Sequence, residues 1–548
     1  MRLWAEWARP WRSGRSAKCA TVLMLTAMLL HGHVQLPQPW HVASPTRVFA
    51  HETATVAAVV DPFADVVPGA RVAAERAADE LSAIRLDVAL DPATGVIGGE
   101  MSITWRNPAS EPLGDVWFRL FPNAFYYGEG GLQVTDATVD GAPVDPELAL
   151  DDTALRVPLP IPIDPGKSAE ITMTFTSTVP ADSTGSYGIF NRDTRNGSWV
   201  LADWYPILAI WEEGDGWALP EATSFGDPTY APSAFYDVRV TAPDDLEVVA
   251  TGVLATETIE NGAVTRHFVA GPARDFVLVA DDDHTPICQE VDGTLLTLWT
   301  PPSLDPTIGA QTLDAAADAL RYYNQRFGPY PAREVDLVQI DPSGALGVAW
   351  AGLLFLDGPA LLSTYGEHDP DGLATVVAHE VAHLWWGILV GGDSNKHAYI
   401  QEGLATVSSL LYLKETLGSD VAGAELAAWV TGPAFDLLAA GDAVVDVPVA
   451  AGDDPTIWSA AAYGKGSLGF LAIRREIGAA AFETALHDLA TRYAWGEMTP
   501  DDLRAAFERA SDRDLDALWS HWFDEAAMTQ EEIEEIAAEF GEQPEIER

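Results

Sequence analysis

The first long pattern along the chain is an alternation of apolar and polar positions between residues 85 and 280. Apolar side chains fall at every second position, first at Leu86, Val88 and Leu90 and again at Met101, Ile103 and Trp105. Short runs punctuated by Asp, Gly, Pro and Asn follow at residues 117–121, 169–175, 236–241, 246–251 and 276–280. A period of two is typical of strands with one buried face. We therefore predict an all-β domain over residues 81–290, built as a sandwich or an open twisted sheet.

The pattern changes to a helical period after residue 304. Apolar positions recur three and four residues apart at Leu313, Ala316, Ala317, Leu320 and Tyr323, which indicates an amphipathic helix. Strands are expected at residues 335–340 and 353–356, and the chain is mostly helical from residue 371 onward. These features predict a second domain over residues 291–527, mostly helical with a small mixed sheet, and hence an α+β multidomain fold. A linker at residues 51–80 and an acidic tail at residues 528–548 are expected to flank the domains.

The first 50 residues differ from the rest of the chain in charge. They carry six basic side chains against one acidic one, and an apolar run over residues 19–30 follows the basic stretch. This order is typical of a secretory signal peptide, and the run is short for a membrane span. We expect residues 1–50 to act as a signal peptide, or as a signal anchor if the segment is retained. The predicted location is secreted or extracytoplasmic, with no stable membrane partner unless residues 19–30 anchor the chain.

The 548-residue chain carries a formal net charge of −51, which excludes some classes of partner. A surface this acidic repels nucleic acid and anionic membranes, and it favours solubility. Attraction of basic substrates is an alternative use of the charge, but a solvated acidic coat is the ordinary explanation. Nucleic acid is therefore not expected among the partners.

A candidate metal site lies in the helical half of the chain, in the segment His379-Glu380-Val381-Ala382-His383. Histidines at i and i+4 lie one turn apart on the same helix face, so their ring nitrogens can converge on one ion. Glu380 follows the first ligand and is suited to hold and deprotonate a water molecule as general base. The alternative is a pair of partly buried histidines beside a capping or salt-bridged glutamate.

The downstream sequence favours the metal site over that alternative. Glu402 lies nineteen positions after His383, at the expected start of a second helical run that stops at Gly418. Packed against the first helix, this run would deliver Glu402 as a third ligand. Three protein ligands and one open position make a catalytic zinc site, so we expect one Zn²⁺ per chain.

These residues resemble the aminopeptidase-N-like gluzincin family of zinc metallopeptidases, and the similarity extends beyond the ligands. Further matching segments are Phe327-Gly328-Pro329-Tyr330-Pro331, Trp385-Trp386-Gly387, Tyr463-Gly464-Lys465-Gly466, Trp204-Tyr205-Pro206, Gly216-Trp217, Tyr236-Asp237-Val238 and Arg274-Asp275-Phe276. The resemblance covers roughly residues 85–525, and it implies a saddle-like β domain followed by a thermolysin-like catalytic domain. It also implies that Tyr463 hydrogen-bonds the oxyanion during attack on a peptide bond, where a phenol donor stabilises the developing charge.

The chain departs from the family pattern at the expected substrate-binding strand. The family carries a Gly-x-Met-Glu-Asn-like segment there, whose glutamate binds the free α-amine of the substrate. The matching residues are Gly347, Val348 and Ala349, with Ala349 in the glutamate position. Alanine cannot pair with an ammonium group, although the backbone here still offers hydrogen bonds to an extended substrate. The family's large helical C-terminal domain is also expected to be absent, which would leave a more open cleft.

The sequence therefore predicts a zinc metallopeptidase that acts on a peptide or protein substrate. Because of Ala349, two specificities stay open: an aminopeptidase that recognises the amine through other acidic groups, and a peptidase with relaxed end preference. The alternative function is that of a secreted non-catalytic binding protein with a vestigial metal site. The intact set of ligands and base argues against this alternative, because loss of catalysis normally removes one of them.

Overall fold

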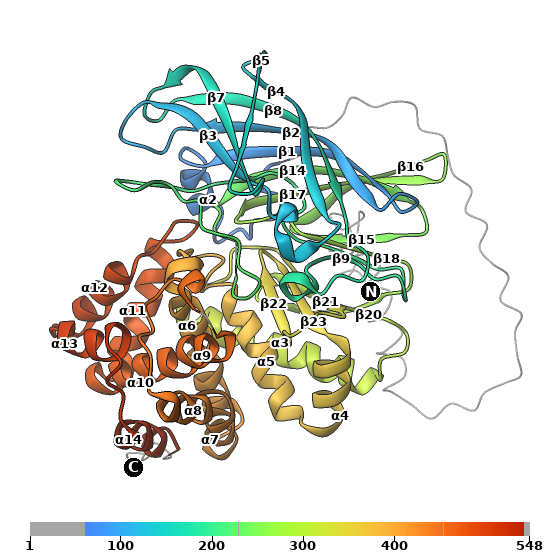
Figure 1. Cartoon of the computed structure of the whole chain (residues 1–548). Helices are drawn as coiled ribbons and strands as arrows, with labels where there is room; N and C mark the ends of the chain where they lie inside the picture. The colour runs from blue at the N-terminus through green and yellow to red at the C-terminus, as the bar shows by residue number, and fades with distance from the viewer. Residues whose placement is uncertain (1–60, 228, 453, 542–548) are drawn as a thin grey trace, which may run out of the picture.

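The computed structural model describes residues 61–227, 229–452 and 454–541, which form an N-terminal β domain and a mostly helical C-terminal domain (Figure 1). This arrangement confirms the predicted fold class, an α+β multidomain protein with a small mixed sheet in its second domain. The predicted signal segment, including residues 19–30, lies outside the described residues. Among the described helices, none is both long enough and apolar enough to cross a membrane.

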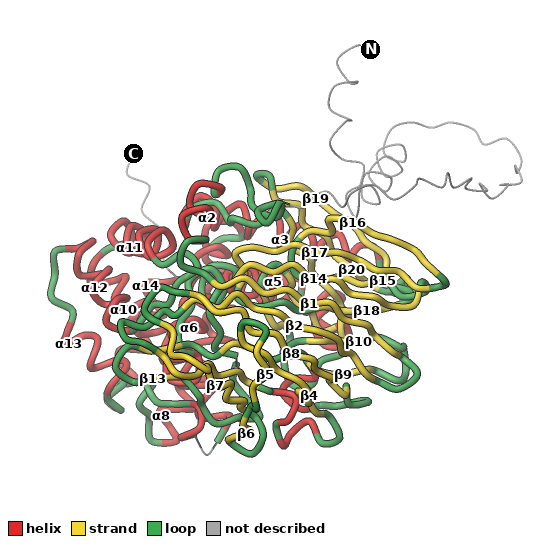
Figure 2. Tube along the Cα trace, turned by 90° about the horizontal axis from the view of Figure 1, so that it is seen from above, coloured by secondary structure: helices red, strands yellow, loops and turns green. Residues whose placement is uncertain are grey.

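An eight-stranded sheet forms the frame of the described β domain, in the order β16-β17-β14-β1-β2-β8-β4-β5, and Figure 2 shows its strands side by side. β1 pairs with β14 in parallel, and the other neighbours are antiparallel. Every second residue of β1 is buried, as the alternation in the sequence predicts. The strands are β1 (Ser82–Asp91), β2 (Val96–Arg106), β4 (Gly131–Val139), β5 (Ala142–Val144), β8 (Ser168–Thr178), β14 (Ala234–Pro243), β16 (Val253–Glu260) and β17 (Ala263–Ala273).

Two four-stranded sheets and a ribbon complete the described β domain. The sheet β15-β18-β10-β9 packs on the C-terminal domain through an apolar cluster that includes Val200, Val279, Val338 and Phe355. This contact brings the β domain against the sheet of the C-terminal domain. The strands are β3 (Leu113–Arg119), β6 (Glu147–Ala149), β7 (Ala154–Ile163), β9 (Phe190–Arg192), β10 (Trp199–Leu201), β11 (Ile207–Leu208), β12 (Trp211–Glu212), β13 (Gly216–Trp217), β15 (Glu247–Ala250) and β18 (Leu278–Asp281).

The C-terminal domain begins with a five-stranded sheet in the order β19-β20-β21-β23-β22. The two strands predicted at residues 335–340 and 353–356 are present as β21 and β23. β22 lies at the edge of the sheet, antiparallel to β23, so one side of its backbone is open to an added strand. The strands are β19 (Thr285–Val291), β20 (Thr294–Thr300), β21 (Glu334–Ile340), β22 (Gly347–Trp350) and β23 (Leu353–Asp357).

Three helices form the centre of this domain: α3 (Pro306–Phe327), α5 (Pro370–His383) and α6 (Ser394–Thr416), with α5 packed against the other two. The expectation that the second helical run starts at Glu402 is wrong, because α6 begins at Ser394. The Asp393 carboxylate caps α6 by accepting the N–H groups of Asn395 at 3.0 Å and Lys396 at 3.2 Å. The backbone of α6 is interrupted at His397 (φ −130°, ψ 44°), and Glu402 lies in the regular helical segment that follows this kink.

Most of the remaining helices and helical turns lie around these three in the second domain, whereas α2, η1, η2 and η3 belong to the β domain (Figure 1). They are α2 (Arg71–Ala77), η1 (Phe121–Asn123), η2 (Phe125–Tyr127), η3 (Gly185–Gly188), η4 (Gly358–Tyr365), α4 (Gly366–His368), α7 (Ser419–Leu426), η5 (Ala427–Thr431), α8 (Gly432–Ala440), η6 (Val449–Ala451), α9 (Pro455–Ser459), η7 (Ala460–Lys465), α10 (Gly466–Ile477), α11 (Ala479–Arg492), α12 (Pro500–Ser511), α13 (Asp516–Trp519), η8 (Ser520–Asp524) and α14 (Gln530–Gly541).

Both segments expected to flank the domains contain packed structure where they are described. The expected linker contains the helix α2, and Val66 makes a β-bridge to Ala332 of the C-terminal domain. In the expected acidic tail, α14 buries Ile533, Ile536 and Phe540. These apolar contacts were hidden in the sequence by the high density of charged residues around them.

Candidate active site

The helix α5 places His379 and His383 on one face. It starts cleanly because Pro370 is its first residue and the Asp369 carboxylate accepts the N–H of Gly372 at 3.0 Å. The two imidazole rings lie one turn apart, with ring centroids 4.6 Å apart and Nε2 atoms 3.0 Å apart. The structure therefore brings together the two histidines whose spacing suggested a shared ion.

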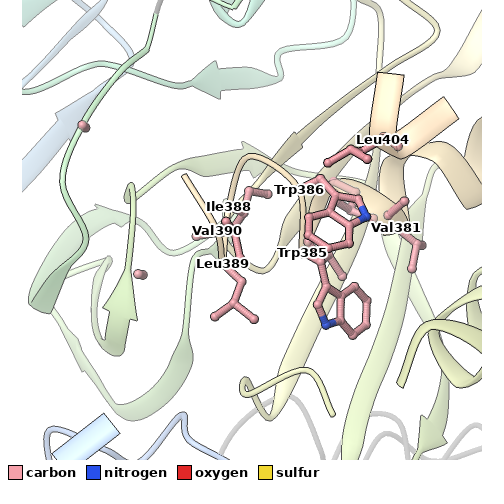
Figure 3. Close-up of a cluster of buried hydrophobic side chains, with 14 of the residues drawn as sticks. Val381, Trp385, Trp386, Ile388, Leu389, Val390 and Leu404 are labelled. Atoms are coloured by element: carbon pink, nitrogen blue, oxygen red, sulfur yellow. The ribbon is translucent and has the colours of Figure 1, made fainter. Parts of the chain in front are cut away.

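The helix α6 brings the third candidate ligand to the same point. Glu402 Oε2 lies 3.5 Å from His379 Nε2 and 3.3 Å from His383 Nε2, and the glutamate is buried. A tryptophan-rich core fixes the two helices relative to each other: Figure 3 shows Trp385 and Trp386 near Val381 and Leu404. The Trp386 indole also donates to Ser408 Oγ on α6 at 3.2 Å.

The hydrogen bonds of the candidate ligands leave electron pairs free that can bind a divalent cation. His383 Nδ1 lies 3.0 Å from the carbonyl oxygen of Trp386, and since a carbonyl only accepts, Nδ1 carries the proton and Nε2 keeps its lone pair. Glu402 Oε2 is buried and has no hydrogen-bond partner among the described residues. Electron-pair donors thus converge from two imidazoles and one carboxylate, a donor set that suits zinc and leaves a coordination position open.

Glu380, the candidate base, lies on the cleft side of α5 beside β22. Its side chain is buried, and a Cβ atom at Gly347 would lie 2.6 Å from its carboxyl carbon. Burial raises the pKa of Glu380 to about 7, with Glu402 adding to the rise and His383 opposing it. A carboxyl group with a pKa near neutrality can both accept and return a proton during turnover.

Tyr463, the candidate oxyanion donor, lies on the π-helical turn η7 and faces the histidines. Its ring centroid is 6.1 Å from that of His379. Burial, the charge of Glu402 and the nearby Tyr187 phenol hold the pKa of Tyr463 well above its usual range. The phenol therefore keeps its proton and remains a hydrogen-bond donor. Two residues later, the buried Lys465 ammonium bonds both carboxylate oxygens of Asp442 at 3.0 Å and fixes the end of the turn.

The predicted substrate strand forms one wall of a cleft that contains these groups. Gly347, Val348 and Ala349 belong to the edge strand β22, and all three line a cavity of about 640 Å³ together with His379, His383, Glu380, Glu402 and Tyr463. The cavity also has a broad apolar lining, including Phe225, Trp429 and Trp458. A cleft of this volume between two domains is typical of a small-molecule or peptide site.

Two cleft residues supplied by the β domain were not foreseen from the sequence. Asp227 lines the cavity, accepts the N–H of Thr229 at 3.0 Å and lies 3.5 Å from the Gln401 amide nitrogen. Burial raises the pKa of Asp227 to about 6. Tyr187 lines the same cavity and reaches it from η3. Both residues lie in irregular loops, where no periodicity in the sequence indicates which side chain will meet a site in another domain.

Comparison with known sequences identifies relatives with a related catalytic half. Residues 311–522 match the model of the Peptidase family M1 domain. Aminopeptidase N of Acetobacter pasteurianus is 25% identical over 288 residues, which cover 51% of this chain and 78% of that protein. Aminopeptidase M1-A of Oryza sativa subsp. japonica is 28% identical over 243 residues, covering 42% of this chain and only 27% of the relative.

Comparison with solved structures extends the similarity to both domains. An M1 zinc metallopeptidase from Deinococcus radiodurans aligns with a TM-score of 0.60 at 19% identity, over 82% of this chain and 94% of that one. A two-domain M1 zinc metallopeptidase mutant bound to L-arginine aligns with a TM-score of 0.58 at 20% identity, over 85% and 94% of the two chains. The fold described above is therefore shared with two-domain M1 peptidases.

Proposed function

This chain belongs to the M1 family of zinc metallopeptidases, and on that premise we propose that it hydrolyses peptide bonds at the amino end of peptides or proteins. The convergence of His379, His383 and Glu402 beside Glu380 in a domain-interface cleft carries the proposal. A binding protein has no need for a general base next to a three-ligand zinc site with an open position.

The residues of the cleft divide the chemistry among them. Zinc, when bound by the three ligands, polarises the carbonyl group that is attacked. Glu380 accepts a proton from the attacking water and returns it to the leaving nitrogen, for which its place in the cleft lining beside His379 and His383 is suited. Tyr463 donates its phenol proton in a hydrogen bond to the oxygen that becomes negative. The edge of β22 aligns the extended substrate through backbone hydrogen bonds.

We assign recognition of the substrate amine to Asp227. Ala349 offers no charge in the position where the family's glutamate is expected. Asp227 and Asp275 both line the cleft outside the zinc site, and each accepts a backbone N–H. Burial raises the pKa of Asp275 and the Arg274 guanidinium lowers it, whereas Asp227 lies beside Gln401, next to the ligand Glu402. An ammonium group beside Asp227 would supply the countercharge that its burial lacks. A single carboxylate binds an amine less tightly than two, so we expect a moderate preference for free amino ends.

The alanine at position 349 also favours a second specificity, in which the protein cleaves peptides with little preference for a free end. Without a charged side chain at Ala349, a longer chain can pass along β22 beyond the site of cleavage. We also propose export of the protein, on the basis of the basic and then apolar segment at its N-terminus.

Paired peptides test these specificities. One peptide is offered to the zinc-loaded protein with a free amino end and with an N-acetyl group, and kcat/KM is measured for both. We expect the free peptide to be cleaved about 100-fold faster, as is typical when a buried charge loses its partner. The variant Asp227→Asn should remove most of this preference, while Asp215→Asn, at an exposed position, should not.

Three outcomes separate the proposals. Equal cleavage of both peptides would support relaxed end preference and overturn the role of Asp227. Preference for the free amine that survives in Asp227→Asn would place amine recognition elsewhere. If the zinc-loaded protein cleaves no peptide of a broad library, the hydrolase proposal fails and the binding-protein alternative stands.

A further inference from the structure

Tyr187 reaches the active-site cleft from the β domain, on a loop that the catalytic domain holds in place. The residue lies in η3 (Gly185–Gly188) and lines the same cavity as His379 and Tyr463. Its carbonyl oxygen accepts the N–H of Ser343, which precedes the edge strand β22, at 3.0 Å. The loop is therefore attached to the substrate-binding side of the catalytic domain, and the phenol is placed by both domains.

The backbone of this loop is strained in a way that orients the phenol. Ser186 and Tyr187 have φ angles of 41° and 61°, so two consecutive side-chain-bearing residues adopt left-handed backbone. Such conformations are unfavourable for residues with side chains and persist only where the surrounding structure enforces them. Close packing enforces this one: a Cβ atom at Gly185 would lie 2.2 Å from the carbonyl oxygen of Tyr126.

The hydroxyl group of Tyr187 has a free proton to donate. Its oxygen accepts the N–H of Gly226 at 2.8 Å, which fixes the phenol in one orientation. No residue in the described part of the chain accepts the hydroxyl proton in return. A phenol is both a donor and an acceptor. The contact with Gly226 uses the acceptor and fixes the direction of the O–H group, which can therefore donate to a molecule in the cleft.

Tyr187 lines the same cavity as Tyr463 and Glu402, and the charges of this cavity act on its phenol. Burial is the main cause of a raised pKa at Tyr187, and the charges of Glu402 and Asp227 add to it. Tyr187 in turn contributes to the raised pKa of Tyr463. Two protonated phenols, one from each domain, thus share a cavity with the carboxylate that completes the candidate zinc site. A carbonyl oxygen that gains negative charge during attack is an acceptor that suits both donors.

We propose that Tyr187 is a second oxyanion donor, which hydrogen-bonds the attacked carbonyl oxygen of the substrate together with Tyr463. This assignment rests on the proposed peptidase function and adds to it a catalytic residue supplied by the β domain. The hydrogen bond from Ser343 to the Tyr187 carbonyl oxygen then has a purpose: it keeps the two domains from moving apart, which would misplace the donor.

The variant Tyr187→Phe tests the proposal, because it removes one oxygen atom and keeps the ring and the backbone constraints. With a free-amine peptide, we expect kcat to fall by about 10- to 100-fold with little change in KM, as for the loss of one oxyanion donor. The affinity for a phosphonate peptide analogue, whose tetrahedral phosphorus mimics the attacked carbonyl, should fall by a similar factor. Tyr126→Phe is the matched control, since that phenol oxygen is buried and has no partner among the described residues; it should leave both quantities unchanged.

A double-variant comparison separates this role from an indirect one through the neighbouring Asp227. If Tyr187 donates to the oxyanion, its loss should lower kcat by the same factor in the wild-type and Asp227→Asn backgrounds. If Tyr187→Phe instead raises KM, and has no further effect once Asp227 is replaced, the phenol only positions the aspartate and the proposal is overturned. Equal phosphonate affinity in Tyr187→Phe and wild type also overturns it. Failure of the wild type to cleave any peptide would instead refute the peptidase function itself.

Discussion

The backbone of Gly347 lies so close to Glu380 that a side chain at position 347 would displace the base. A Cβ atom there would lie 2.6 Å from the carboxyl carbon of Glu380, well inside van der Waals contact. The edge strand that is expected to hold the substrate therefore also forms the wall that positions the carboxylate. Substrate alignment and base alignment are coupled through this single contact.

Gly347→Ala should consequently lower kcat by about 10-fold or more, because a misplacement of about 1 Å can cost 100-fold. Zinc content and the melting temperature should change little. Gly423→Ala is the matched control, since a Cβ atom at Gly423 meets nothing within 4 Å. Steady-state kinetics of the two variants check the prediction; unchanged kcat in Gly347→Ala would show that Glu380 does not need its present position.

Removal of the third ligand should weaken metal binding. We expect Glu402→Ala to lower zinc affinity by more than the 10- to 100-fold that is typical for loss of an outer-shell partner. Competition with a chromogenic chelator measures this. Glu415→Ala is the control, since Glu415 lies on the same helix but contacts Tyr322 and Arg326. Equal zinc affinity in Glu402→Ala and wild type would remove Glu402 from the ligand set.

The ligand pair and the β domain could be predicted from the sequence because local spacing determines them. Two histidines four residues apart share a helix face wherever that helix lies, and the alternation at Leu86, Val88 and Leu90 requires a strand with one buried side. Asp227 and Tyr187 could not be found in this way. Their loops have no periodicity, and their positions depend on how the β domain packs against the catalytic sheet.

The buried carboxyl group of Asp203 should make stability depend on pH. Burial raises the pKa of Asp203 to about 8, whereas in the unfolded chain it is about 4. Between these values the folded state holds one more proton, so this group lowers stability as pH rises, by up to about 1.4 kcal/mol per pH unit. Asp203→Asn keeps an acceptor for the Thr229 hydroxyl and removes the ionisation.

The measurement is the free energy of unfolding in urea for both proteins from pH 5 to pH 8. We expect the free energy of unfolding of Asp203→Asn to increase steadily relative to that of the wild type as pH rises. Because both proteins carry the same zinc site, the contribution of metal loss cancels in the difference. Parallel stability curves would contradict the raised pKa.

Loss of the Lys465 ammonium should destabilise the turn that carries Tyr463. Lys465 is fully buried and bonds Asp442 and the carbonyl oxygens of Ala443 and Glu525. Lys465→Met leaves the carboxylate of Asp442 buried without its cation, which should cost about 3–5 kcal/mol. The double variant Lys465→Met with Asp442→Asn should recover part of the loss. Urea unfolding of the three proteins tests this, and an equal loss in the single and double variants would exclude an unpaired charge as the cause.

Product mapping by mass spectrometry tests the central claim most directly. A peptide library is incubated with wild type and with Glu380→Gln, each confirmed to hold one zinc ion per chain. If two imidazoles and one carboxylate hold a zinc ion whose neighbouring base drives hydrolysis, wild type releases defined products and Glu380→Gln releases none. Equal product release by the two metal-loaded proteins would contradict this account of the site.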